Sequence, residues 1–206
     1  MCIVSTSNIN TTTSYHHGNL REALLINGLQ LLESSQGTDF SMRELTRMIG
    51  VSPNAVYRHF ANKEELLTAL AIYGFEQLIE AQAHAIHNAT NPKDGFLNSG
   101  KEYIYFAIKN PSLFKLMYSQ FTVAQDDEKL KSMTDLFYTG MLYAAATAVN
   151  APVDTPQSQT MARLAWSIVH GLSYLIIDGQ FSHLSNDELN IMIDNSLKTA
   201  IGISVN

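Results

Sequence analysis

Apolar residues recur along most of this chain at spacings of three and four positions, which place them on one face of an α-helix. The two clearest apolar faces are formed by Met133, Leu136, Phe137, Gly140, Met141 and Ala144, and by Met161, Leu164, Ala165, Ile168, Leu172, Leu175 and Ile176. No segment combines a period of two with a hairpin turn, the pattern typical of β-strands. The sequence therefore predicts an all-α protein.

Helix starts are marked by polar capping residues. A Ser or Asn followed three residues later by Glu provides acceptors for the free N–H groups of a first helical turn, and such pairs begin at Asn19, Ser41, Asn62 and Ser185. A hydroxyl residue before Pro marks two further starts, at Ser52 and Thr155. With the periodicity, these signals predict about nine helices, at residues 19–35, 42–49, 53–60, 63–88, 94–109, 111–120, 126–149, 156–180 and 186–202.

The predicted helices fall into two domains. Residues 1–14 carry no charge and consist mostly of Ser, Thr and Asn, so we expect a disordered tail there. Residues 15–62 hold three short helices and form an N-terminal domain, and residues 63–206 form a larger C-terminal helical domain. The predicted helix at 63–88 has no break and links the two.

Composition narrows the class of protein. Hydrophobic residues make up 46% of the chain, as in globular proteins, and the single Cys2 excludes an internal disulfide and a Cys-based zinc site. The net charge of −6 arises after residue 62, because residues 1–62 hold four basic and four acidic side chains. No uninterrupted apolar run approaches the roughly 18 residues of a membrane span, and no signal peptide begins the chain. We expect a cytoplasmic protein without a membrane partner.

The stretch GVSPNAVYRHFANKEELL, residues 50–67, has the pattern of a helix-turn-helix motif. In this motif two short helices flank a tight turn, here at Gly50, and the second helix reads base edges in the major groove of DNA. Val56 and Phe60, four residues apart, predict an inner face for that helix. Asn54 and Arg58, also four apart, face outward, where Asn suits adenine and Arg suits guanine.

Three further residues are candidates for contacts with DNA phosphates. Tyr57, His59 and Lys63 can each donate a hydrogen bond to a phosphate oxygen. The helix that starts near Lys63 also directs its free N–H groups and the positive end of its dipole outward. Two plainer interpretations stay open: Tyr57 and His59 as partly buried core residues, and Arg43 and Arg58 as solvated surface charges.

The motif resembles a known family. FSMRELTRMIGVSPNAVYRHFANKEELL, residues 40–67, is similar to the DNA-binding module of TetR/AcrR (tetracycline-repressor-like) transcriptional regulators. YHHGNLREALL, residues 15–25, and WSIVHGL, residues 166–172, resemble the branch of that family with a WHG-type C-terminal domain. The resemblance implies a double-stranded DNA operator as partner, contacted by Ser41, Arg43, Ser52, Pro53, Asn54, Ala55, Tyr57, Arg58, His59 and Lys63.

The resemblance also implies that the C-terminal helices hold a pocket for a small-molecule effector. Aromatic and Met side chains are concentrated in these helices and can form an apolar cavity with a few polar groups. The residues that we expect to line it are Tyr103, Phe106, Phe114, Met117, Phe121, Phe137, Met141, Trp166, His170 and Tyr174. The alternative is that these residues form plain hydrophobic core.

The last two predicted helices, 156–180 and 186–202, are the candidates for a homodimer interface. Each has an apolar face, and two such helices from each subunit can form a four-helix bundle. A two-fold dimer presents two recognition helices to a pseudo-palindromic operator. The alternative is that both faces serve only the core of the monomer.

Signals for catalysis, cofactors and metals are poor. The sequence contains no Gly-rich phosphate loop, no Gly-x-Ser-x-Gly elbow and no His-Glu-x-x-His pair, and His84 and His87 lack a clear third ligand. We expect no enzyme activity, no cofactor and no metal site. The favoured function is a repressor released from its operator by a small apolar or amphipathic effector. The alternatives are a helical carrier or enzyme whose front helices are only structural, and a regulator that acts without an effector.

Overall fold

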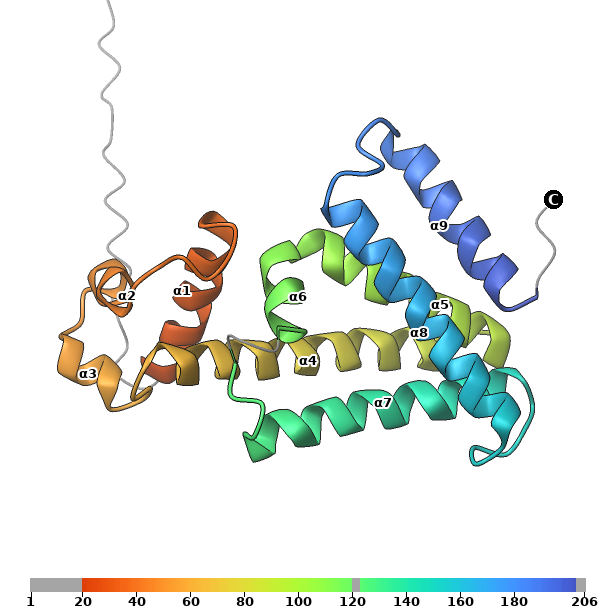
Figure 1. The fold of residues 1–206 in the computed structure, drawn as a ribbon, viewed down its shortest axis with the longest axis horizontal. Coiled ribbons are helices and arrows are strands. Elements are labelled where there is room, and N and C mark those ends of the chain that lie inside the picture. Colours follow the sequence, from red (N-terminus) through yellow and green to blue (C-terminus); the bar gives the residue numbers. More distant parts are fainter. Residues whose placement is uncertain (1–19, 120–122, 203–206) are drawn as a thin grey trace, which may run out of the picture.

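A computed structural model of the chain describes residues 20–119 and 123–202. Every regular element in these ranges is a helix, which confirms the predicted all-α class (Figure 1). The nine helices are α1 (Leu20–Ser34), α2 (Met42–Ile49), α3 (Pro53–Tyr57), α4 (Lys63–His87), α5 (Pro92–Lys109), α6 (Pro111–Met117), α7 (Glu128–Ala148), α8 (Pro156–Ile177) and α9 (Asn186–Ala200).

The helices form a small group and a larger body. Helices α1, α2 and α3 gather at one end of the molecule, and α4 runs from this group into the body formed by α5 to α9 (Figure 1). Helix α4 packs against α1 on one side of this junction and against α5, α6 and α7 in the body. One helix therefore contributes to both parts of the fold.

The helix starts follow the capping signals in the sequence. Ser41 and Ser185 form complete capping boxes, in which Oγ accepts the N–H of the Glu three residues later and that Glu accepts the N–H of the Ser. Ser52 and Thr155 cap α3 and α8 with Pro at the first helical position. The predicted tail, 1–14, and the cap at Asn19 lie outside the described residues.

Several helix ends differ from prediction by two or three residues. Helix α5 begins at Pro92 rather than at 94, because Oδ1 of Asn91 accepts the N–H of Asp94 (3.0 Å) and caps an earlier turn. Helix α3 ends at Tyr57 rather than at 60, although the N–H of Phe60 still donates to the Val56 carbonyl (3.0 Å). Helix α8 ends at Ile177 rather than at 180, just before Gly179 takes a positive φ of 81°.

The first half of α4 is buried on all sides. Every residue from Leu66 to Ile72 is buried, so this segment has no polar stripe, although one polar residue, Thr68, lies within it. The hydroxyl of Thr68 donates to the Glu64 carbonyl (2.9 Å) and accepts the N–H of Ala124 (2.9 Å), which fixes the segment before α7 onto α4. Its burial therefore leaves no unsatisfied group.

Helix α6 crosses α4 at Gly74. A Cβ atom added to Gly74 would lie 2.5 Å from Sδ of Met117 and 3.2 Å from Cγ of Leu113, both on α6. The two backbones approach closely because glycine has no side chain at this point. Glycine at this position therefore sets the distance between α4 and α6.

We predict that Gly74→Ala lowers the free energy of unfolding by about 1–3 kcal/mol, because the new methyl overpacks a buried contact. The matched control is Gly28→Ala on α1, where the added Cβ would lie 3.5 Å from Leu70, an ordinary contact. There the gain in helix propensity should leave stability unchanged or raised by up to about 1 kcal/mol. Urea denaturation measures both variants, and equal stability of the two would contradict the role given to Gly74.

Candidate DNA interface and internal cavity

The turn between α2 and α3 sets the direction of the candidate reading helix. Gly50 ends α2 in the left-handed conformation, with φ 77° and ψ 29°, and its N–H donates to the Thr46 carbonyl (3.0 Å). Any other L-residue except Asn or Asp is disfavoured at this φ. Oγ of Ser52 then accepts the N–H of Ala55 (3.3 Å) and starts α3. The sequence folds locally as the predicted helix-turn-helix.

The two faces of α3 divide as the sequence predicts. On the inner face, Val56 and Phe60 are 0% and 1% exposed and belong to the core. The Arg21 guanidinium of α1 lies over the Phe60 ring, 5.4 Å from its centroid, and covers the end of this helix. On the outer face, Asn54 and Arg58 are exposed. The helix therefore presents an Asn and an Arg away from the protein.

The remaining candidates surround this outer face. Tyr57 is 49% exposed and His59 is also exposed, so neither is a partly buried core residue. The exposed members of the predicted DNA interface are Ser41, Arg43, Ser52, Pro53, Asn54, Tyr57, Arg58 and His59, and Ala55 is half-buried. These residues are accessible to a partner, and their contacts with DNA stay a prediction.

Ser41 is already engaged within the protein. Its hydroxyl accepts the Glu44 N–H (3.2 Å) and donates to Oε2 of Glu44 (2.9 Å), and its own N–H donates to the same oxygen (2.6 Å). The backbone hydrogen bond from Ser41 is the main cause that lowers the pKa of Glu44, and the hydroxyl adds to it. A phosphate contact through the Ser41 hydroxyl would have to compete with this capping box.

Lys63 is also held by the protein. Its side chain is half-buried, and the ammonium donates to the Thr38 carbonyl and lies 4.8 Å from the centre of the Phe40 ring. These contacts join the start of α4 to the segment before α2. In this arrangement the charge of Lys63 stabilises the junction, and a phosphate contact requires the ammonium to turn outward or to be shared.

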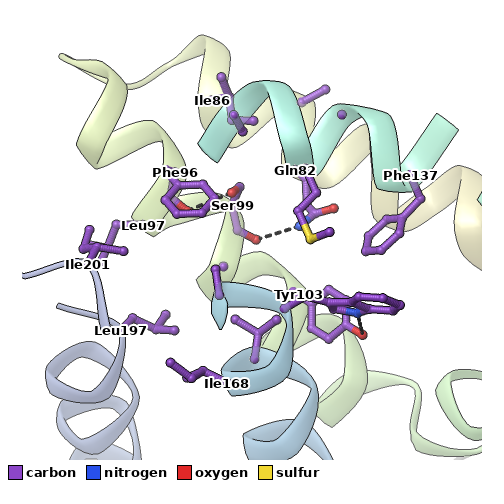
Figure 2. Close-up of a pocket in the computed structure, with 18 of the residues that line it drawn as sticks. Gln82, Ile86, Phe96, Leu97, Ser99, Tyr103, Phe137, Ile168, Leu197 and Ile201 are labelled. Carbon is purple, nitrogen blue, oxygen red and sulfur yellow. Dashed lines mark hydrogen bonds between the residues drawn. The ribbon is translucent and has the colours of Figure 1, made fainter. Parts of the chain in front are cut away.

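The larger body contains a cavity of about 140 Å³ that opens to solvent on the side of the exposed residues Leu136 and Gly140. Its walls come from α4, α5, α7, α8 and the end of α9, and Figure 2 shows Gln82, Phe96, Phe137 and Tyr103 around it. Among the described residues that line it, Tyr103 alone has an ionisable side chain. The wall is therefore mostly apolar, with a few polar groups at fixed places, as in small-molecule sites.

The structure brings only part of the predicted ligand-binding set to this cavity. Tyr103, Phe137, Met141 and Trp166 line it. The predicted members that do not line it are Phe106, Phe114, Met117, His170 and Tyr174, and Phe121 lies outside the described residues. Phe114 and Met117 are 0% and 4% exposed and pack in the core around α6. These two residues fit the alternative interpretation, in which the aromatic and Met side chains form hydrophobic core.

His170 and Tyr103 belong to an aromatic cluster behind one cavity wall. Oη of Tyr103 lies 2.9 Å from Oη of Tyr118 and 2.8 Å from Nδ1 of His170, and the Trp166 indole N–H donates to it (3.4 Å). Burial raises the pKa of both tyrosines well above the usual range and lowers the pKa of His170. The cluster is therefore uncharged at neutral pH, and the Tyr103 hydroxyl has no free hydrogen-bonding capacity.

Sequence reasoning missed most of the cavity because small residues shape it. Gly100, Gly140, Ala144 and Ala165 line the wall, and a Cβ added to Gly140 would meet no atom within 4 Å. In the sequence, Gly140 is the residue that could have indicated the cavity, because it lies within an apolar helix face yet contributes no side chain. A face that lacks a side chain leaves space between helices.

A contact between α1 and α6 connects the small helical group to the body. Asn110 provides no side-chain cap for α6, because its Nδ2 donates to the Phe106 carbonyl (3.0 Å). Glu33 of α1 takes this role: its carboxylate accepts the N–H groups of Ser112 (3.2 Å) and Leu113 (2.9 Å). The first turn of α6 is thus capped by a residue about 80 positions earlier in the chain.

Metal and membrane features are weak. No group of three or more His, Cys, Asp or Glu side chains that could hold a metal ion occurs within residues 20–119 and 123–202. Helix α8 is long and apolar enough to cross a membrane by length and composition, although Arg163 and His170 interrupt it, and only 17% of its most apolar window is buried. One helix of this kind is weak evidence for a membrane segment.

Two family models match the chain. Residues 32–70 match a model described as "Bacterial regulatory proteins, tetR family", and residues 96–196 match one described as "Tetracyclin repressor-like, C-terminal domain". The chain belongs to the TetR family. Members of this family are DNA-binding transcriptional regulators rather than enzymes, and the two matches cover the DNA-binding region and the C-terminal domain of such a regulator. The assignment of its C-terminal half to the WHG branch stays a prediction.

Curated relatives are distant. The chain is 23% identical over 117 residues to the nucleoid occlusion factor SlmA of Marinobacter nauticus, covering 57% of this chain and 60% of that protein. It is 29% identical over 121 residues to the SlmA of Photobacterium profundum, covering 58% and 61%. The matches therefore span less than two thirds of either relative.

Solved structures resemble the fold over most of its length. A Rhodococcus sp. RHA1 protein of unknown function shares 25% identity at a TM-score of 0.75, over 92% of this chain and 95% of that one. The TetR-family transcriptional regulator PfmR of Thermus thermophilus shares 16% identity at a TM-score of 0.67, over 89% and 99%. The fold of helix-turn-helix plus C-terminal domain is thus the TetR fold.

We predict that Glu33→Ala lowers the free energy of unfolding by about 1–3 kcal/mol, because two N–H groups of α6 lose a charged acceptor. Hydrogen exchange gives a local measurement: the amides of Ser112 and Leu113 should exchange faster. Glu33→Gln keeps one acceptor oxygen and should show a smaller effect.

The control for this prediction is Glu80→Ala, which removes the same side chain from an exposed position on α4. This variant should alter the free energy of unfolding by no more than about 0.5 kcal/mol. Unchanged exchange at Ser112 and Leu113 in Glu33→Ala would show that α6 does not depend on the carboxylate.

Proposed function

We propose that this protein is a homodimeric, cytoplasmic repressor that binds a pseudo-palindromic operator and releases it when a small apolar or amphipathic effector enters the cavity. In this proposal residues 15–62 read DNA, residues 63–206 bind the effector and dimerise, and the helix from Lys63 links the two. The observation that carries it is a set of contacts that runs without a gap from the cavity wall to α1.

This set of contacts begins at Tyr103, whose ring lines the cavity. The Tyr103 ring meets that of Phe114 edge-on, with centroids 5.5 Å apart, and its hydroxyl bonds Tyr118 at the end of α6. Helix α6 in turn is capped by Glu33 of α1. A ligand that shifts the Tyr103 wall therefore has a direct mechanical route to α1.

The proposed mechanism is a shift between two populations. The two states differ in the separation of the two reading helices, and only one separation matches the operator. An effector that binds more tightly to the other state raises the population of that state. The affinity for DNA then falls by the ratio of the effector's affinities for the two states. The close contact at Gly74 supports this mechanism, because α6 cannot move toward α4 there and must move along it or away from it.

Exposed apolar residues support a dimer through α8 and α9, which lie side by side in Figure 1. Leu164 and Leu175 of α8 are 47% and 46% exposed, and Ile191 of α9 is 60% exposed. Large apolar side chains gathered on two adjacent helices favour burial by a partner. A second copy of α8 and α9 would complete a four-helix bundle around them.

The first test is operator binding. We expect the purified protein to bind DNA from upstream of its own gene in a gel-shift titration. Asn54→Ala should weaken binding about tenfold and relax the preference for one base pair in each half-site, because a base contact is lost. Tyr57→Phe should weaken binding to all sequences alike, because it removes a phosphate donor.

The matched control for these variants is Glu80→Ala, which should bind as the wild type does. An Asn54→Ala variant with unchanged base preference would remove Asn54 as a base reader. If neither this DNA nor random-site selection yields a bound sequence, the proposed operator function fails.

The second test is the oligomeric state. We predict that Leu175→Arg converts the dimer to a monomer, because a charged side chain is buried without a partner in the proposed interface. Sedimentation equilibrium measures the mass. Ile26→Arg on α1, where Ile26 is 53% exposed, makes the same change far from α8 and should leave the dimer intact. A monomeric wild type would refute the dimer.

A further inference from the structure

We propose that the cavity takes an uncharged molecule that buries a part about the size of one six-membered ring and carries one polar group, such as a cyclic alcohol, a phenol or a cyclic ketone. This inference rests on the proposed function for its role as effector. The binding itself depends only on the chemistry of the cavity wall, which three observations define: its volume, its lack of charge and one oriented amide.

The volume limits the part of the ligand that is buried. At about 140 Å³ the cavity is close to the roughly 150 Å³ of an apolar cavity known to bind benzene. Ring systems also suit the wall, because Phe137 and Trp166 meet edge-on with centroids 6.2 Å apart. Gly140 and Leu136 on the wall are exposed, so any further part of a larger ligand would extend from this opening toward solvent.

The wall excludes charge. Its described residues include no Asp, Glu, Lys, Arg or His, and Tyr103 is held neutral because burial raises its pKa. A carboxylate or an ammonium placed here would lose its water without gaining a counter-ion. The ligand must therefore enter as a neutral molecule.

One polar group of the wall is oriented and open. Nε2 of Gln82 donates to the Ser99 carbonyl (3.1 Å), and because a carbonyl only accepts, this bond fixes which end of the amide is oxygen (Figure 2). No described residue donates to Oε1 of Gln82. This oxygen can accept a hydrogen bond, and the second N–H of the amide has no described acceptor, so Gln82 suits a ligand with one uncharged hydrogen-bonding group.

The donors of the other polar side chains of the wall are occupied. The Ser99 hydroxyl donates to the Phe96 carbonyl (2.8 Å), and the Trp166 N–H donates to the Tyr103 hydroxyl within the aromatic cluster. The Gln82 amide is therefore the polar group of the described wall that has both a donor and an acceptor open. A ligand hydroxyl placed at Gln82 leaves its ring among Phe96, Phe137 and Trp166.

The chain contains a natural reporter for this site. Trp166 is the only tryptophan, and it lines the cavity. Its indole N–H gives a single signal in a nitrogen–proton NMR spectrum, which ring ligands without chromophores do not obscure. We would titrate full-length protein with four probes of one ring size: cyclohexanol, cyclohexanone, cyclohexanecarboxylate and cyclohexylammonium.

We expect cyclohexanol to shift the Trp166 signal in a saturable way. Cyclohexanone, which can accept from the second N–H of Gln82, should bind within about fivefold of the alcohol, since each makes one hydrogen bond to the amide. The carboxylate and the ammonium should bind at least about tenfold more weakly than the alcohol. Charged probes that bind as tightly as cyclohexanol would overturn the proposal.

Two variants test the location. Gly140→Leu adds a side chain where the wall is open, and it should abolish binding of cyclohexanol. Thr139→Leu adds the same side chain at an exposed neighbour on α7 and should bind as the wild type does. Gln82→Met should weaken binding of the alcohol and of the ketone alike, because it removes the amide while keeping the apolar contacts with the ring. Undiminished binding to a folded Gly140→Leu variant would place the ligand elsewhere.

The titration needs no DNA, so its outcome is separate from that of the proposed function. Loss of cyclohexanol binding with intact operator binding would refute only the ligand class. Binding of cyclohexanol that leaves operator affinity unchanged would uphold the ligand class and refute the effector mechanism.

Discussion

The structure depends on one helical segment that is buried on every side. Between Leu66 and Ile72, α4 is buried against the reading domain on one side and the C-terminal body on the other, so it cannot slide or roll without exposing apolar surface. Burial of a helix on every side makes it a shared core element rather than a flexible linker. The two domains therefore pack as one body at this junction, and any relative motion must occur around α4.

Helix α6 is the element best placed to move around that axis. It has only seven residues, it lacks a side-chain cap of its own, and its attachments are to different parts of the molecule. Glu33 of α1 caps its start, Gly74 of α4 lies against it, and Lys115 pairs with Asp178 at the end of α8 (2.6 Å). Short helices depend on tertiary contacts for their stability. A change at the Tyr103 wall, which touches Phe114 on α6, thus acts on an element that is held by α1, α4 and α8.

The sequence predicted what local chemistry determines. The caps at Ser41, Ser52 and Ser185 and the two faces of α3 follow from residues within four positions of one another, and the structure confirms them. The cap that Glu33 gives to α6 and most of the cavity wall were not predicted, because their residues are far apart in sequence. Aromatic density placed Phe114 and Met117 in the predicted ligand site. In the structure both pack in the core, whereas the cavity lies where side chains are small, and the binding roles of the predicted residues stay a prediction.

The glycine at 140 has an evolutionary consequence. A helix-interior glycine costs roughly 0.5–1 kcal/mol relative to alanine, yet no atom lies near enough to forbid a side chain at this position. Single-nucleotide substitutions convert a glycine codon to alanine or valine and an alanine codon to valine. The shape of this cavity can therefore change by one methyl group at a time, while the residues on the outer face of α3 stay the same.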